Sequence, residues 1–221
     1  MNIYFLGSRA HLFEEQLKDY GHKVTLIKSH KEVKKCDVCL VSGCYEIIPE
    51  EYLNIPKYGF VGFHETDLPK GRGCAPINWT LINGKKKLVI CAFKIVKGMD
   101  EGEILRDFVY KIKNGDTCDD LRNQANNVIA ELLDVFFNSA YDVDCLFGTA
   151  FCNAKKQTGR PTYYRKRHAE DSRIDIDKPI KGQWNLIRSC SDKEGYPAFF
   201  EIYDRKFKIV PMEVKNENIG N

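Results

Sequence analysis

Apolar residues in the first half of the chain gather into short runs, which glycine-containing or polar turns separate. Helical spacing of Leu12, Leu17 and Tyr20 predicts a helix between the first two runs, and Gly21 ends it. The runs predict strands over residues 2–6, 24–27, 38–41, 59–63, 88–96 and 104–112, and those at 38–41 and 59–63 are expected to be buried. A strand–helix–strand beginning is typical of α/β proteins with a parallel sheet.

The strongest helical pattern extends over residues 119–137. Thr117 and Asp120 have the spacing of a capping box that opens this helix. A shorter helix is predicted over residues 75–82, where Asn83 and Gly84 end it. One broad apolar face of the long helix carries Leu121, Ala125, Val128, Ile129, Leu132, Leu133 and Phe136.

The pattern of apolar and polar residues changes after the long helix. Residues 153–173 are polar and basic and predict a loop, and residues 184–189 predict a short helix. Apolar runs at 199–203 and 207–210 predict a hairpin that turns at Asp204 and Arg205. We therefore expect an α/β protein with a Rossmann-like, mostly parallel sheet in residues 1–155. A small helix and β-hairpin subdomain is expected in residues 156–221.

Composition narrows the class of protein. The 221 residues are 43% hydrophobic, enough for a substantial core. No run approaches the 18 apolar residues of a transmembrane helix, and the N-terminus lacks a signal-peptide pattern, so we expect no membrane insertion. A net charge of +3 argues against a nucleic-acid partner. Nine scattered cysteines, an odd number, favour a reducing cytoplasm over a disulfide framework.

Three cysteines raise the possibility of a metal site. Cys36 and Cys39 are spaced C-x-x-C, and Cys44 follows. On a strand, residues three apart point to opposite faces, so we expect no metal there and interpret these cysteines as small buried apolar residues. Cysteine-based hydrolysis through Cys74 or Cys44 lacks an activating partner visible in the sequence.

A dinucleotide site is also disfavoured. Gly7-Ser8-Arg9 after the first strand is not a G-x-G-x-x-G motif, and no acidic residue ends the second strand.

The chemically richest stretch covers residues 63–76. His64 ends a predicted parallel strand, which is where ligands bind in open α/β sheets. Gly71 and Gly73 in the loop that follows allow backbone to approach a ligand closely, and Arg72 adds a charge. An isolated histidine would more often be a structural one, but this loop favours a binding site.

This stretch resembles the formyltransferases that use 10-formyltetrahydrofolate. Their pattern N-x-H-x-S-L-L-P-x-x-R-G-x-A-P corresponds to residues 62–76, and their G-x-D-x-G-x-I corresponds to residues 98–104. An N-G turn lies between the two, at Asn83 and Gly84. The resemblance covers most of residues 36–212 and implies the formyltransferase fold, with N10-formyltetrahydrofolate as co-substrate.

The resemblance also implies site residues. His64 would transfer a proton, with Asp100 orienting it, and Thr66 would be a candidate donor to the oxyanion. The family's asparagine is Gly62 here, so Thr66, a backbone amide or a water would have to replace its donor. A catalytically silent folate- or nucleotide-binding homologue is the rival interpretation. The folate would lie against Glu46, Ile47, Ile48, Val96, Lys97 and Gly98.

Among the family's acceptors, we expect a nucleotide-linked amino sugar of surface-polysaccharide biosynthesis. Methionyl-tRNA is the second candidate and glycinamide ribonucleotide the third. The chain's 221 residues are short for a member that acts on tRNA. The expected acceptor-binding residues are Lys70, Arg72, Tyr163 and Tyr164. A basic cluster could hold a diphosphate: Lys155, Lys156, Arg160, Arg165, Lys166 and Arg167. A homodimer through the C-terminal hairpin is a further possibility.

Overall fold

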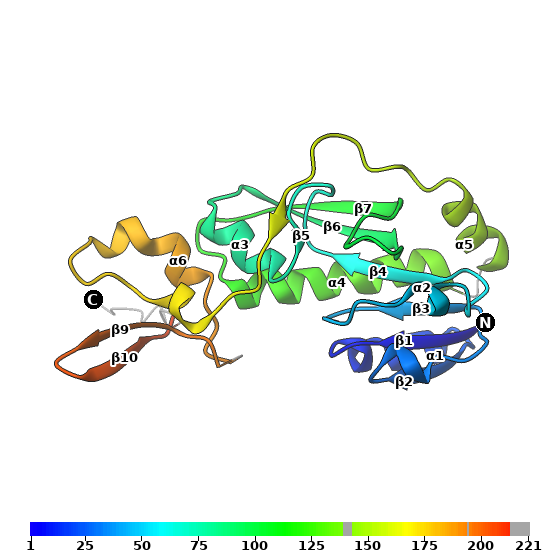
Figure 1. The fold of residues 1–221 in the computed structure, drawn as a ribbon, viewed down its shortest axis with the longest axis horizontal. Helices are drawn as coiled ribbons and strands as arrows, with labels where there is room; N and C mark the ends of the chain where they lie inside the picture. Colours follow the sequence, from blue (N-terminus) through cyan, green and yellow to red (C-terminus); the bar gives the residue numbers. More distant parts are fainter. Residues whose placement is uncertain (139–142, 194, 213–221) are drawn as a thin grey trace, which may run out of the picture.

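The computed structural model describes residues 1–138, 143–193 and 195–212 (Figure 1). Its strands are β1 (Asn2–Leu6), β2 (Lys23–Ile27), β3 (Val38–Val41), β4 (Phe60–His64), β5 (Arg72–Gly73), β6 (Lys87–Lys94), β7 (Ile104–Lys111), β8 (Tyr163–Tyr164), β9 (Ala198–Ile202) and β10 (Arg205–Ile209). Its α-helices are α1 (Glu14–Asp19), α2 (Glu50–Leu53), α3 (Pro76–Ile82), α4 (Cys118–Phe137), α5 (Val143–Cys152) and α6 (Trp184–Arg188). Short 3₁₀ turns lie at Ala10–Leu12, His30–Glu32, Ala169–Ser172 and Ile180–Gln183.

Six strands form the central sheet, in the order β2-β1-β3-β4-β6-β7. The first four are parallel, and β6 and β7 extend the sheet in antiparallel pairing. The predicted α/β class with a mostly parallel sheet is therefore confirmed. The carboxyl ends of β1, β3 and β4 meet at one edge, which positions the residues that follow them.

The long helix α4 lies along one face of the sheet (Figure 1). Its predicted capping box is present, because the Asp120 N–H donates to the Thr117 hydroxyl and the Asp120 carboxylate accepts from the Thr117 N–H. Leu121, Val128, Ile129 and Leu133 are fully buried in the main core. Burial of such side chains stabilises the fold by about 1.5–3 kcal/mol each, which fixes α4 beneath the sheet.

A second apolar cluster covers the opposite face of β1, β3 and β4. The positions of Cys36 and Cys39 show that the strand-alternation argument made above does not apply to this pair. Cys36 lies before β3 begins, so strand alternation does not separate it from Cys39, and both pack in this cluster. Burial raises the pKa of the Cys36 thiol to about 11 and raises that of Cys39 further. Neutral thiols of this kind behave as small apolar side chains.

The C-terminal part lies at one end of the elongated molecule, with α6 and the β9–β10 hairpin (Figure 1). The hairpin turns at Tyr203 and Asp204, both with positive φ, one residue earlier than expected. Residues 153–173, the connecting segment, are largely irregular as predicted, but β8 within them pairs with β5. Helix α5 was not predicted. No helix among the described residues is long and apolar enough to span a membrane.

Candidate active site

A cavity of about 420 Å³ opens beside the carboxyl ends of the parallel strands. Ser8 and Arg9 follow β1, residues 43–48 follow β3, and His64 and Glu65 close β4. The loop between β6 and β7 forms another wall, and the connecting segment contributes residues 166–168. The strand-end rule for α/β sheets therefore locates this cavity correctly.

His64 is held by contacts on both ring nitrogens. Its Nε2 lies 2.9 Å from the Gly71 carbonyl oxygen, and its Nδ1 lies 3.7 Å from Oδ2 of Asp100. The Phe93 ring packs at its edge, with ring centroids 6.4 Å apart. A carbonyl only accepts, so Nε2 carries the proton in the neutral ring and Nδ1 keeps the lone pair. Nδ1 is therefore the nitrogen that can gain and release a proton.

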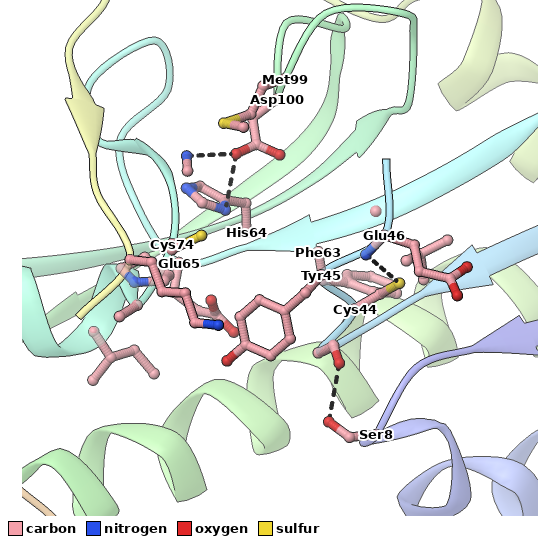
Figure 2. Close-up of a pocket in the computed structure, with 18 of the residues that line it drawn as sticks. Ser8, Cys44, Tyr45, Glu46, Phe63, His64, Glu65, Cys74, Met99 and Asp100 are labelled. Atoms are coloured by element: carbon pink, nitrogen blue, oxygen red, sulfur yellow. Dashed lines mark hydrogen bonds and ion pairs between the residues drawn. The ribbon is translucent and has the colours of Figure 1, made fainter. Parts of the chain in front are cut away.

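Asp100 is fixed independently of the histidine. Its Oδ2 accepts a 2.7 Å hydrogen bond from the Gly73 N–H, and its backbone has a φ of 50° in the left-handed region (Figure 2). Aspartate tolerates that conformation better than most residues. Asp100 reaches His64 from the loop between β6 and β7, so the two residues that the resemblance pairs lie together although 36 positions separate them.

The residues predicted to lie against the folate also come together. The cavity lining includes all six of them: Glu46, Ile47, Ile48, Val96, Lys97 and Gly98. Glu46 accepts a 3.0 Å hydrogen bond from the His30 N–H and lies 2.7 Å from Nδ1 of that ring. The backbone hydrogen bond from His30 lowers the pKa of Glu46 and ties the loop after β3 to the turn before it.

Gly62 and Thr66 are arranged differently from the expectation. A Cβ on Gly62 would lie 2.8 Å from Cε1 of Phe93, so an aromatic ring, and neither Thr66 nor Asp67, occupies that space. The Thr66 hydroxyl donates to the Gly71 carbonyl at 3.3 Å, and Thr66 is not among the residues that line the cavity. Thr66 thus supports the loop that also holds His64.

The four expected acceptor-binding residues lie outside the cavity lining. Lys70 donates to the Arg160 carbonyl at 2.5 Å, and Tyr164 stacks on Trp79. Buried Arg72 binds Gln157, lies 2.8 Å from Glu101, and donates to the Tyr163 hydroxyl at 3.1 Å. These side chains fasten the connecting segment to the loops beside β5 and between β6 and β7. The sequence identified these four residues as polar or aromatic side chains near the site, but it could not show that they lie outside the cavity lining.

Cationic residues of the connecting segment and of α4 also line the cavity. Of the basic cluster, only Lys166 and Arg167 line it, with Arg122 and His168 beside them. Arg167 donates to Ser172 Oγ at 3.1 Å, whereas its buried Nε has no hydrogen-bond partner among the described residues. Tyr196 provides an aromatic surface there. Arg122 was not predicted, because nothing in its local sequence distinguishes it from other polar residues of α4.

Arg9 and Glu65 form an ion pair in the cavity wall, in which the Glu65 side chain is buried and the Arg9 side chain is partly exposed. Glu65 follows β4 directly and Arg9 lies in the turn after β1, so the rule that selected His64 could also have selected them. Figure 2 shows His64 between Asp100 and Glu65. Among residues 1–138, 143–193 and 195–212, no three His, Cys, Asp or Glu side chains are grouped to hold a metal ion.

The comparisons with known proteins agree with this geometry. A family model described as formyl transferase matches residues 12–133, more than half of the chain. The chain belongs to the formyl transferase family, as the resemblance of residues 62–105 implied.

Two curated relatives are methionyl-tRNA formyltransferases. That of Thermodesulfovibrio yellowstonii is 32% identical over 92% of this chain and 62% of its own length. That of Malacoplasma penetrans is 30% identical over 80% of this chain and 53% of its own length. The chain thus spans between half and two thirds of the length of these relatives.

Solved structures with the same fold include both acceptor classes. A methionyl-tRNA formyltransferase from Clostridium thermocellum has a TM-score of 0.74 at 24% identity, covering 98% of this chain and 95% of its own. A sugar N-formyltransferase from Shewanella sp. has a TM-score of 0.72 at 16% identity, covering 98% and 99%. The formyltransferase PseJ from Anoxybacillus kamchatkensis, in complex with UDP-4,6-dideoxy-4-formamido-L-AltNAc and tetrahydrofolate, has a TM-score of 0.62 at 19% identity, covering 74% and 85%.

Proposed function

We propose that the chain transfers the formyl group of N10-formyltetrahydrofolate to the amine of a nucleotide-linked amino sugar. The observation that carries the acceptor class is that cations from the connecting segment and α4 share one cavity with the His64–Asp100 pair. Apolar and backbone surfaces near Ile48 and Val96 suit a flat pteridine, and the His64–Asp100 pair lines the same cavity. Lys166 and Arg167 of the connecting segment and Arg122 of α4 suit the phosphates of a nucleotide.

In this proposal His64 moves one proton. The acceptor nitrogen attacks the formyl carbon, and the bond from that carbon to N10 of the folate breaks as the tetrahedral oxyanion collapses. Nδ1 of His64 takes a proton from the attacking nitrogen and returns it to the departing N10. Asp100 stabilises the imidazolium in between, because its carboxylate faces Nδ1 at 3.7 Å.

Both parts of the chain contribute to this site. Residues 1–155 supply the folate surface and the His64–Asp100 pair, and residues 156–221 supply Lys166, Arg167 and Tyr196. We therefore keep the division into a catalytic domain and a small C-terminal subdomain as part of the proposal.

One assay compares the acceptors. The protein is mixed with N10-formyltetrahydrofolate and either UDP-4-amino-4,6-dideoxy-L-AltNAc, its 4-hydroxy counterpart, dTDP-4-amino-4,6-dideoxyglucose, or methionyl-charged initiator tRNA. Tetrahydrofolate release and the mass of the product are measured. We expect a formylated amino sugar and an unreacted hydroxy sugar. Formylated methionyl-tRNA at a comparable rate would overturn the proposed acceptor, and no release with any amine would favour a silent homologue.

Methionyl-tRNA is the second candidate, because the curated relatives described above have that name. A tRNA acceptor requires an extended cationic surface, whose contribution falls steeply as salt is added. The cations named here instead converge on one concave site. Binding of total tRNA with a steep salt dependence would favour the second candidate.

We also propose that the hairpin mediates a homodimer. Tyr203 is 90% exposed at the turn, and Ile202 and Phe207 on the two paired strands also expose apolar surface. Contiguous exposed apolar side chains often mark interaction sites. Sedimentation equilibrium of the chain and of Phe207→Asp is the test; a monomer at micromolar concentration would contradict the dimer.

A further inference from the structure

A second carboxylate borders the proposed reaction centre. Glu65 follows His64 directly at the end of β4, lines the cavity, and is only 4% exposed. The proton transfer through His64 and Asp100 does not use it. A buried carboxylate is unfavourable unless positive or hydrogen-bonding groups compensate it, so its partners indicate its role.

The partners of Glu65 leave one oxygen available. Arg9 approaches Oε1 through a single nitrogen, Nη2, while its Nη1 lies 3.5 Å from Oδ1 of Asn126 on α4. Within the described residues, Oε2 receives no hydrogen bond. An ionised carboxylate offers about four acceptor sites, so this monodentate pair retains capacity for another donor. Arg9 supplies the compensating charge and fixes the orientation of the carboxylate.

The chemistry of the proposed acceptor matches this arrangement. An amino sugar nucleotide is a zwitterion near neutral pH, with an ammonium group on the sugar and negative charge on the diphosphate. The cavity has a carboxylate next to His64 in the sequence, and Lys166 and Arg122 line it as cations. Negative and positive ends of the acceptor would thus meet opposite charges, and the ammonium end would lie at the reaction centre.

We propose that Glu65 binds the acceptor ammonium through Oε2 and places its nitrogen beside His64, with Arg9 as the positioning residue for Glu65. This inference rests on the proposed function. Glu65 would make the site selective for amines over hydroxyl groups, because a neutral hydroxyl forms a weaker hydrogen bond to a carboxylate than an ammonium does. Of the two protons that the ammonium loses, one goes to solvent and the other moves through His64 Nδ1 to N10, so the overall transfer is balanced.

Glu65→Gln is the principal test, because it removes the charge and nearly preserves the shape. We expect the KM of the amino sugar to rise by about 10- to 100-fold below the pKa of its amine, with the KM of the folate within about 2-fold. Above that pKa the amine is neutral, so the ratio of mutant to wild-type KM should fall towards one. Glu131→Gln, an exposed carboxylate on α4, is the matched control and should change neither KM.

A purely structural role for the pair predicts other results. Glu65→Gln leaves the partly buried Arg9 without its partner and can lower stability, so Arg9→Met/Glu65→Gln removes both charges together. The double variant should regain thermal stability and keep the pH-dependent rise in acceptor KM. A KM within 2-fold of wild type, or a rise equal at every pH, would overturn the role of Glu65.

Calorimetry without folate separates this inference from the proposed function. Wild-type protein should bind UDP-4-amino-4,6-dideoxy-L-AltNAc at least about 10-fold more tightly than its 4-hydroxy counterpart, and Glu65→Gln should abolish the difference. Equal binding of the two sugars by the wild type would overturn the inference even if formyl transfer occurs. A preference for the amine that Glu65→Gln removes would support it even if no transfer occurs.

Discussion

Oδ2 of Asp100 lies 3.7 Å from Nδ1 of His64 while it accepts the Gly73 N–H at 2.7 Å. The carboxylate is therefore held in place by backbone before the imidazole gains a proton. His64 is fixed from its other side by the Gly71 carbonyl. Because both partners are positioned in advance, little rearrangement is required when charge develops on the ring, which is the condition for effective electrostatic stabilisation.

Asp100→Asn tests the charge of this pair separately from its geometry. The asparagine oxygen can still accept from Gly73, and asparagine tolerates the positive φ of this position. We expect kcat for formyl transfer to fall by about 10²–10⁴-fold, because the imidazolium loses its counter-charge. Folate affinity, measured by fluorescence titration, should stay within about 2-fold.

His64→Ala should lower kcat by a similar factor of about 10²–10⁴. Asp107→Asn, on the exposed face of β7, is the control for replacing a carboxylate by an amide and should leave kcat unchanged. Near wild-type turnover in His64→Ala or Asp100→Asn would exclude this pair from the reaction.

Gly62→Asn tests whether the family's donor can be restored. The new Cβ would lie 2.8 Å from the Phe93 ring, so we expect lower stability, by about 1–3 kcal/mol, and lower activity. Phe93→Leu in the same chain should relieve the clash and recover both. Chemical denaturation and kcat of the two variants are measured. If Gly62→Asn alone raised kcat without loss of stability, the ring would not occupy the donor position.

Local patterns made much of the fold predictable. The face of α4 repeats within a single helix, and the Thr117–Asp120 box depends on residues only three positions apart. His64 could be predicted as a site residue because the carboxyl ends of parallel strands share an edge. The one-residue error at the hairpin turn arose because Tyr203 adopts a positive φ that its residue type does not signal.

The rest depends on long-range packing. Arg122 reaches the cavity only because α4 passes beneath the strand ends. Lys166 lines the cavity, whereas the neighbouring Arg165 binds Asp171. Phe93 fills the space above Gly62 through the antiparallel pairing of β4 and β6. No spacing of residues along the sequence could have predicted these contacts.

The ion pair of Arg165 and Asp171 gives a pH-dependent prediction. Hydrogen bonds from Arg165 hold the pKa of Asp171 at about 2, below its ordinary value of 3.8. A lowered pKa means that the folded state favours the ionised form. The stabilisation is therefore complete above about pH 4 and is lost as the pH falls towards 2.

Asp171→Asn should lower the urea midpoint at pH 7, and the difference from wild type should shrink to roughly half at pH 3. The Asn oxygen can still accept from the His168 N–H, so the variant isolates the charge. Urea unfolding at pH 7, 5 and 3 makes the comparison, with Asp107→Asn as reference. A difference that stays constant over this range would show that Asp171 acts through shape alone.

Lys166 and Lys70 form a matched pair that tests where the acceptor diphosphate binds. Lys166 lines the cavity. Lys70 is outside the cavity lining, and its ammonium donates to the Arg160 carbonyl of the connecting segment. We expect Lys166→Ala to raise the acceptor KM by about 5- to 20-fold, because a charge-assisted contact with phosphate is lost. Lys70→Ala should stay within about 2-fold, because its lysine does not reach the cavity.

Added salt provides the second measurement for this pair. Salt screens ionic contacts that are open to solvent, so the wild-type acceptor KM should rise between 50 and 300 mM NaCl. Lys166→Ala should show a shallower rise, since it has one ionic contact fewer, and Lys70→Ala should follow the wild type. If Lys70→Ala instead had the larger effect, the diphosphate would bind beside Arg72 and Tyr163, where the sequence alone placed it.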